Sequence, residues 1–241
     1  MLTGGGGGSG SSLGGFSAPA DGLPSAAFRW PRRFATSTAL SNAPTTSAYG
    51  SPVRFVATVS AARPLVAGTV SFAADGQTIA GCGAQPVARN DVTGRMEASC
   101  TTAALRAGLR PVVARYTGYT NDDAVRGAST SPTVAHVVTR AASKVTVSCS
   151  PNPVVYPDSV QCTATVTGPT TAPTGKVTWT SSGLGGFTFV SCSLSGGTCS
   201  VAYRPAATDV RLTGGITIRA TYLGDNNHRE TANVTTLAVR R

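Results

Sequence analysis

The side chains best suited to redox, metal or nucleophilic chemistry are few in this sequence. Six of them are cysteines, at Cys82, Cys100, Cys149, Cys162, Cys192 and Cys199. Zinc ribbons and thioredoxin-like sites need a Cys-x-x-Cys pair, and no such pair occurs. A reactive thiol is the alternative, but neither histidine, His136 or His228, neighbours a cysteine in the sequence. An even number of cysteines without metal or catalytic spacing favours disulfides and an oxidising compartment.

The other catalytic patterns are weak. His136 lies in a segment of alternating apolar residues typical of a strand, and His228 lies in a loop. Asp122 and Asp123 are adjacent and would face opposite sides of a strand. A glycine pattern in residues 5–10 fits the dinucleotide fingerprint, but no strand precedes it and no helix follows it. The sequence therefore predicts a protein that is not an enzyme, without catalytic residues or a cofactor.

Two matching loops carry polar tips, at residues 120–123 and 225–227. Oxygen-rich loops can bind calcium, but neither loop has the spacing of an EF-hand. Asn and Asp residues are also the ordinary residues of turns, so we expect turn chemistry and no metal site. Residues 233–235 form a glycosylation sequon, which only a eukaryotic secretory route would use.

The net charge alone would suggest an anionic partner, but the distribution of the basic residues does not. The net charge is +10, with 20 Lys and Arg against 10 Asp and Glu. The arginines are scattered, with doublets only at Arg32–Arg33 and Arg240–Arg241, and no aromatic–basic interleaving occurs. We therefore expect no nucleic-acid partner. No apolar run approaches the roughly 18 residues of a membrane helix, and residues 1–34 lack the pattern of a secretory signal peptide.

An internal repeat organises the rest of the chain. Tyr49 matches Tyr156, and seven such pairs up to Phe72 and Trp179 share a separation of 107 positions. The match returns at a separation of 106, where Tyr116 matches Tyr222. Two copies of one unit of about 100 residues explain this pattern, and that length suits a sandwich domain.

Each copy alternates apolar and polar residues with a period of two. Residues 53–59, 160–166 and 216–222 show this alternation, and glycine, proline and asparagine turns separate the runs. Only residues 101–109 have helical character, enough for one turn. The sequence predicts an all-β protein of two tandem immunoglobulin-like antiparallel β-sandwich domains, at residues 35–139 and 140–241. Because the linker at residues 139–142 is short, we expect little hinge freedom between them.

Residues 1–34 differ from the repeat and are predicted to be a Gly/Ser-rich flexible arm or linker. Phe28, Trp30 and Phe34 lie among three arginines at its end. A sticky linker is one interpretation of this aromatic cluster, and an anchoring arm is the other.

The repeat resembles the bacterial Ig-like repeats of group-3 type. The residues that carry the likeness are 150–153, 159–166, 173–177 and 220–225, with a weaker version at 53–59, 68–70 and 114–118. Tyr119 stands where the second copy has Asp225, so the first copy lacks the aspartate of this turn. The resemblance implies an Ig-like fold and a role as a spacer, stalk or adhesive module in a surface or secreted protein.

The repeat narrows the 15 possible cysteine pairings. Cys82 and Cys100 lie in the same inter-strand region as Cys192 and Cys199 of the second copy. Cys149 and Cys162 fall opposite Asn42 and Phe55, so the first copy lacks both members of that pair together. We therefore expect the bonds 82–100, 149–162 and 192–199.

Four aromatic residues are predicted to lie in the cores. Phe72 and Trp179 occupy equivalent positions in the third strand, where a sandwich needs its largest side chain. Tyr116 and Tyr222 end a long strand before a glycine turn, and we expect their hydroxyls to bond backbone at this corner.

These patterns favour a non-catalytic extracellular or cell-surface protein with a structural or adhesive role. An alternative is an assembly subunit, either a virion decoration or tail protein or an extracellular filament protomer, that uses residues 1–34 as an anchoring arm. A third interpretation is a carbohydrate-binding module. The expected partners are other copies of the chain or neighbouring surface or virion proteins, and glycans in the third interpretation.

Overall fold

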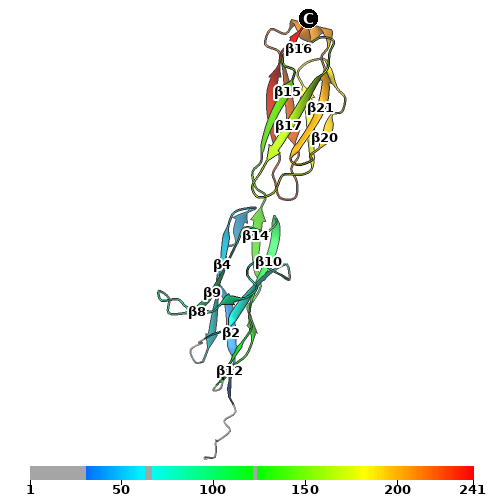
Figure 1. Ribbon diagram of the computed structural model, residues 1–241. Coiled ribbons are helices and arrows are strands. Elements are labelled where there is room, and N and C mark those ends of the chain that lie inside the picture. The colour runs from blue at the N-terminus through cyan, green and yellow to red at the C-terminus, as the bar shows by residue number, and fades with distance from the viewer. Residues whose placement is uncertain (1–30, 63–66, 122–123) are drawn as a thin grey trace, which may run out of the picture. The chain divides into compact units, whose positions relative to one another are not determined.

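The computed structural model describes residues 31–241, except 63–66 and 122–123, and residues 31–241 form one compact unit. The described part of the chain is built from β-strands, with one short 3-10 helix, η1 (Ala207–Arg211). Its strands make two antiparallel sandwiches of the immunoglobulin-like type in sequence order (Figure 1). The predicted fold class is therefore confirmed.

The first sandwich has two sheets that face each other. One sheet has the order β2 (Thr36–Asn42), β4 (Val53–Ala61), β9 (Met96–Thr102) and β8 (Ala88–Arg89). The other has the order β3 (Thr46–Ala48), β14 (Val134–Thr139), β10 (Gly108–Tyr116), β5 (Thr69–Ala74) and β6 (Gln77–Thr78). β13 (Ser129–Thr130) pairs with β10, and β7 (Gln85–Pro86) pairs with β5.

The second sandwich repeats this plan. One sheet has the order β15 (Lys144–Ser150), β17 (Val160–Thr167), β21 (Thr198–Arg204) and β19 (Gly186–Phe187). The other has the order β20 (Ser191–Ser193), β18 (Lys176–Ser181), β22 (Ile216–Tyr222) and β23 (Thr231–Leu237). A short parallel pair, β16 (Val154–Val155) with β24 (Val239–Arg240), closes one end of this sandwich.

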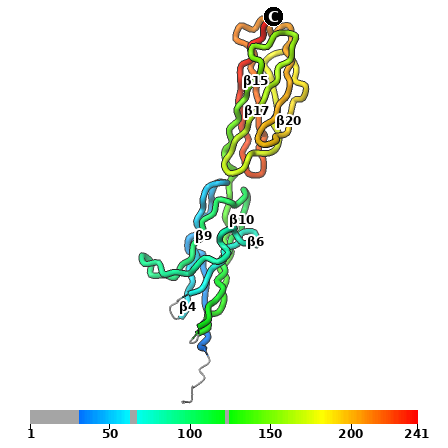
Figure 2. Tube along the Cα trace, viewed as in Figure 1, coloured from blue at the N-terminus to red at the C-terminus, as the bar shows by residue number. Residues whose placement is uncertain are grey.

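Period-two alternation produces two separate cores. Along β4 and β17 every second residue points inward, so Phe55 and Cys162 are fully buried while Arg54 and Gln161 face water. The buried apolar residues fall into one main cluster between Val53 and Tyr116 and another between Val145 and Val239. The tube in Figure 2 follows the chain through the first set of strands before it enters the second.

The predicted core aromatics lie inside these clusters. Phe72 on β5 and Tyr222 on β22 are fully buried, and Trp179 on β18 and Tyr116 on β10 are nearly so. The indole Nε1–H of Trp179 donates to Cys192 Sγ at 3.2 Å. In the first sandwich, His136 is also buried, with its ring edge-on to Phe55 and its Nε2 2.9 Å from Ser47 Oγ.

Three sequence expectations need correction. Residues 101–109 form no helical turn, because β9 continues to Thr102 and β10 begins at Gly108. Phe34, assigned to the flexible arm, lies in a strand, β1 (Arg32–Phe34), which pairs in parallel with β12 (Ala124–Arg126); β11 (Tyr119–Thr120) completes this small sheet. The third concerns Tyr222, whose hydroxyl has no hydrogen-bond partner among the described residues, whereas Tyr116 Oη donates to the Ala67 carbonyl at 3.0 Å. Phe28 and Trp30 lie outside the described residues.

Candidate functional site at the junction of the two sandwiches

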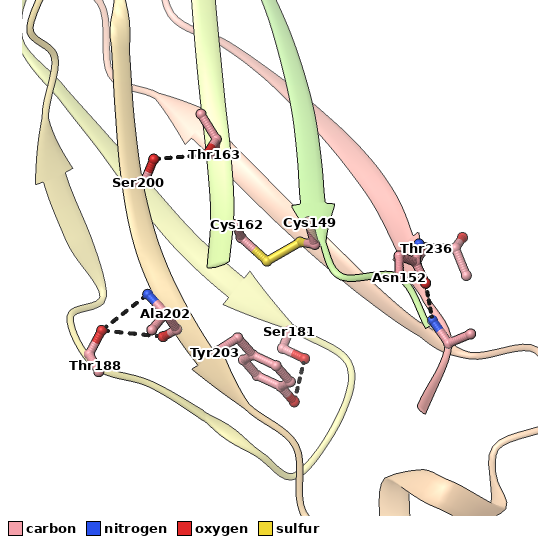
Figure 3. The surroundings of a disulfide bond; sticks show 11 residues. Cys149, Asn152, Cys162, Thr163, Ser181, Thr188, Ser200, Ala202, Tyr203 and Thr236 are labelled. Carbon is pink, nitrogen blue, oxygen red and sulfur yellow. Dashed lines mark hydrogen bonds between the residues drawn. A yellow bond between two sulfur atoms is a disulfide. The ribbon is translucent and has the colours of Figure 1, made fainter. Parts of the chain in front are cut away.

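Three disulfides fix the strands. They join Cys82 to Cys100, Cys149 to Cys162 and Cys192 to Cys199, the same pairs that the repeat predicts. Cys149 and Cys162 are direct cross-strand neighbours on β15 and β17 (Figure 3). A disulfide restricts the unfolded chain, so each bond raises the stability of its sandwich. All six thiols are consumed in this way, so no cysteine is free for nucleophilic chemistry.

A buried carboxylate organises the far loops of the second sandwich. Asp209, in η1, is 1% exposed and accepts backbone N–H bonds from Leu184, Gly185 and Ala206 at 3.0, 3.2 and 2.8 Å. The hydroxyl of Tyr203 donates to the same carboxylate at 3.3 Å and also lies next to Ser181 (Figure 3). Burial, partly offset by the Ser181 hydrogen bond, raises the pKa of Tyr203. These bonds hold the loop in shape and use up the carboxylate, so Asp209 is a structural residue.

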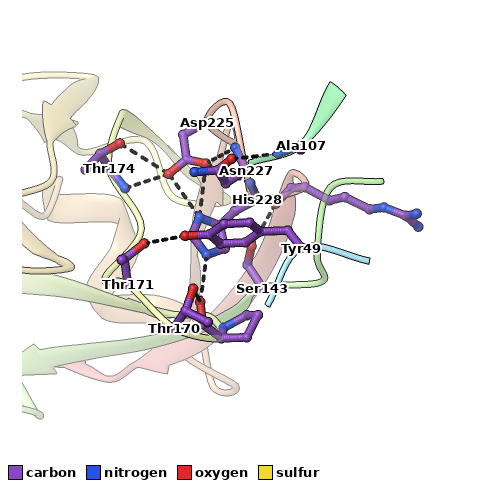
Figure 4. A network of polar contacts seen from close by, with 11 residues as sticks. Tyr49, Ala107, Ser143, Thr170, Thr171, Thr174, Asp225, Asn227 and His228 are labelled. Carbon is purple, nitrogen blue, oxygen red and sulfur yellow. Dashed lines mark hydrogen bonds and ion pairs between the residues drawn. The ribbon is translucent and has the colours of Figure 1, made fainter. Parts of the chain in front are cut away.

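The functional candidate is the cluster where the two sandwiches meet. Tyr49, which follows β3, is only 7% exposed because its ring lies against the second sandwich (Figure 4). The Tyr49 ring packs edge-on to His228 with the ring centroids 5.4 Å apart. The Tyr49 hydroxyl lies 3.0 Å from Thr171 Oγ1. One aromatic side chain of the first sandwich thus contacts two loops of the second.

His228 is held in place by the turn that contains it. Its Nδ1 lies 3.0 Å from Asp225 Oδ1, and its Nε2 lies 3.5 Å from the carbonyl oxygen of Pro169. Both contacts fix the plane of the imidazole ring, which is 1% exposed. A Cβ atom at Gly168 would lie 2.5 Å from His228 Cδ2, so only glycine lets the loop approach the ring this closely.

Asp225 is the polar centre of the cluster. Its carboxylate accepts backbone N–H bonds from Thr174 at 2.9 Å and from Asn227 and His228 at 2.7 Å each. Burial acts to raise the pKa of Asp225, but these hydrogen bonds and the one from the His228 imidazole outweigh it, so the pKa lies well below its ordinary value. The carboxylate is therefore ionised at neutral pH and stabilises the turn that presents His228 to Tyr49.

Backbone bonds reinforce the same junction. Between β14 and β15, Ala141 donates to the Asn227 carbonyl at 2.9 Å and accepts from the Arg229 N–H at 2.8 Å. The side-chain oxygen of Asn227 in turn accepts from the backbone N–H of Ala107, in the first sandwich, at 3.1 Å. The linker is thus paired to the second sandwich rather than suspended between the two.

The contacts at the junction hold the two sandwiches together. A cleft of about 600 Å³ lies beside Tyr49 and is lined by alanine and threonine side chains together with Arg106 and Asn227. Within the described ranges, no group of three His, Cys, Asp or Glu side chains lies close enough to hold a metal ion. No helix in the described part of the chain is both long and apolar enough to span a membrane.

Sequence reasoning identified the scaffold better than the junction. Asp225 and His228 were assigned to a polar loop, and Tyr49 served only to define the repeat. The predicted cysteines and core aromatics lie inside the individual sandwiches and do not take part in the junction. Asp122 and Asp123 lie outside the described residues. Sequence position gave no signal for this contact, because Tyr49 lies 90 residues before the end of the first copy and Asp225 lies 85 residues after the start of the second.

Comparisons with solved structures give distant matches. The chain is similar to the adhesin InvE of Yersinia pseudotuberculosis, with 14% identity, a TM-score of 0.38, and coverage of 85% of this chain and 58% of that chain. The fibronectin(III)-like modules of Clostridium thermocellum CbhA match with 16% identity, a TM-score of 0.28, and coverage of 84% and 94%. The D0-D1 domain of intimin matches with 16% identity, a TM-score of 0.26, and coverage of 84% and 97%. The chain thus spans less than two thirds of the InvE chain.

No curated protein matches the sequence. A family model, the bacterial Ig-like domain (group 3), matches residues 40–139. It covers the first copy, although the sequence motifs resembled this family more clearly in the second. The family and the disulfides support a structural or adhesive role and an extracellular or surface location. Residues 40–139, in the first sandwich, are therefore similar to the bacterial Ig-like domain of group 3.

Proposed function

We propose that residues 31–241 form a non-catalytic spacer or adhesive segment on a bacterial cell surface, made of two Ig-like domains divided at residues 139/140. The family match of the first sandwich and the disulfides support this proposal. The observation that carries it is the burial of Tyr49 against His228 and Thr171. A spacer transmits position and force only if its domains do not swing freely, and this contact resists such swinging.

Removing the Tyr49 ring tests this proposal. In Tyr49→Ala, the edge-on contact and the hydroxyl bond are both lost, so the distribution of interdomain distances from small-angle scattering should broaden. Proteolysis at residues 139–143 should accelerate as well. Tyr49→Phe keeps the ring but loses the hydroxyl, so its distance distribution and its proteolysis rate should lie between those of the natural chain and of Tyr49→Ala. Tyr156→Ala is the matched control, because Tyr156 is the repeat equivalent of Tyr49 and is 37% exposed. An unchanged distance distribution in Tyr49→Ala would refute the coupled spacer.

The assembly alternative depends on the N-terminal segment. Virion and filament subunits use terminal arms to reach a neighbour, and the pairing of β1 with β12 shows that the chain enters the first sandwich as a strand. Protection of residues 1–30 from proteolysis in native material would favour this alternative, and rapid cleavage would oppose it. Glycan binding stays a sequence prediction, which a glycan array tests.

A further inference from the structure

The backbone around Tyr49 is repeated at the other end of the second sandwich. Tyr49 N–H donates to the Thr139 carbonyl at 2.9 Å, and Tyr156 N–H donates to the Arg240 carbonyl at 2.8 Å. Each tyrosine follows a short strand in parallel pairing with the last strand of its sandwich, β3 with β14 and β16 with β24. Tyr156 is therefore equivalent to Tyr49 in backbone geometry as well as in the sequence repeat.

The two tyrosines differ in what covers them. Tyr49 is 7% exposed and Tyr156 is 37% exposed, and Val155 beside Tyr156 is 48% exposed. Leu212 is a third exposed apolar residue, 46% exposed, in the loop equivalent to residues 103–107 of the first sandwich. That loop supplies Ala107 to the junction. The second sandwich thus has a tyrosine equivalent to Tyr49, but no loops of a following sandwich cover it in this structure.

We propose that Val155, Tyr156 and Leu212 form a docking surface for a further Ig-like domain that presents an Asp-x-x-His turn like residues 225–228. This inference rests on the spacer function proposed above and extends it to a third domain. The turn is the chosen partner because it is what covers the equivalent tyrosine at the junction (Figure 4). The two rings meet at an interplanar angle of 86°, and a threonine side chain meets the phenol oxygen.

The residue after each tyrosine's carbonyl partner is also equivalent in the two sandwiches. Arg140, directly after Thr139, lines a cleft with Arg229 and Glu230, which follow the 225–228 turn, and the Arg229 Nε–H donates to the Arg140 carbonyl at 2.9 Å. Arg241 directly follows Arg240, whose carbonyl takes the place of the Thr139 carbonyl, so Arg241 occupies the position of Arg140. A docked domain of this type would therefore place an arginine that donates to the Arg241 carbonyl, with a glutamate beside it, as at the natural junction.

The free end of the first sandwich does not fit the role of this partner. Gly118 lies against the Arg126 carbonyl as Gly224 lies against that of His228, so Arg126 takes the place of His228. Tyr119 pairs with Arg126 as Asp225 pairs with His228, so Tyr119 takes the place of the aspartate. The first sandwich of a second copy therefore cannot offer Tyr156 an Asp-x-x-His turn. The second sandwich of that copy has one, but Tyr49 already occupies it.

A three-sandwich chain tests the proposal. Residues 1–240 are followed by a second copy of residues 140–241, so that Arg240 precedes Arg140 as Thr139 does in the natural chain. We expect the added junction to behave like the natural one, with slow amide exchange at the added Ala141 and Arg229. In the three-sandwich chain, Tyr156→Ala in the central sandwich should speed exchange at the added Ala141 and Arg229 by about tenfold or more. In the natural chain, the same substitution should leave exchange at Ala141 and Arg229 unchanged.

A matched variant on the partner side makes the test specific. His228→Ala in the added copy removes the ring that Tyr156 would contact, and combining it with Tyr156→Ala should add little further effect. Tyr49→Ala in the same chain reports on the natural junction. If Tyr49→Ala speeds exchange at its own junction but Tyr156→Ala has no effect at the added one, the docking surface is refuted and the spacer stands. If neither substitution has an effect, both proposals fail.

Discussion

The two sandwiches share a backbone plan but present different side chains at their loop ends. Gly127 N–H donates to Phe34 O at 3.1 Å in the first, and Arg229 N–H donates to Ala141 O at 2.8 Å in the second. At the same corner Thr36 Oγ1 donates to Gly127 O, and Ser143 Oγ to Arg229 O.

Only the second sandwich, however, carries the Asp225–His228 pair. The comparison teaches that backbone pairing repeats with the fold, while contact with a neighbouring domain depends on a few loop side chains.

The largest expected effect tests whether the two cores are independent. Phe72→Ala and Trp179→Ala each empty the centre of one sandwich, so each should lower the free energy of unfolding of its own sandwich by about 3–5 kcal/mol. Denaturant unfolding followed by peptide-resolved proteolysis separates the two. Loss of both sandwiches in either variant would show a single cooperative unit instead.

The next effect concerns the disulfides, of which the second sandwich has two and the first has one. The chain-entropy model assigns about 3 kcal/mol to the Cys82–Cys100 bond, which closes a separation of 18 residues, and about 2 kcal/mol to Cys192–Cys199, which closes 7. The Cys82→Ala/Cys100→Ala variant should therefore lose more stability than Cys192→Ala/Cys199→Ala. Thermal unfolding of the two variants measures the order, and the reverse order would contradict the entropic account.

Acid should affect the second sandwich first. The pKa of Asp225 lies below its unfolded value of 3.8, so its stabilisation is complete above about pH 4 and is lost as the pH falls towards the folded pKa. The groups that face this carboxylate are the N–H of Thr174, Asn227 and His228, the Thr174 hydroxyl, the His228 ring and the Tyr222 hydroxyl. Asp225→Asn should cost about 2 kcal/mol at pH 7 and flatten the acid limb of the stability curve.

The first sandwich has Tyr119 at this place and provides the internal control. When acid unfolding is followed for each sandwich separately, the first sandwich should show no loss of stability that is removed by substituting Tyr119. An unchanged acid limb in Asp225→Asn would mean that other carboxylates control acid unfolding.

The smallest effect distinguishes the two corner tyrosines. Tyr116 Oη donates to the Ala67 carbonyl, so Tyr116→Phe should cost about 1 kcal/mol. Tyr222 Oη is buried without a partner among the described residues, and burial and the nearby Asp225 raise its pKa. Tyr222→Phe should therefore be neutral or slightly stabilising. Equal losses in the two variants, measured by thermal unfolding, would show that a partner satisfies the Tyr222 hydroxyl.

The sequence by itself determined the local pattern. Alternation at residues 53–59 and 160–166 requires one buried face, because side chains of a strand alternate between its two sides. The repeat showed that the chain makes this sandwich twice, and the shared absence of two cysteines from the first copy indicated which thiols pair. These properties depend on spacing along the chain, so they can be predicted without coordinates.

Only the tertiary structure decided what the loop ends do. Asp225 and His228 look like an ordinary polar turn until Tyr49, far away in the sequence, is placed against them. Phe34 looked like part of an arm until β1 paired with β12. In both cases the outcome depends on contacts between distant segments, and burial of Tyr49 but not of Tyr156 follows from which surface lies opposite each ring rather than from the residue itself.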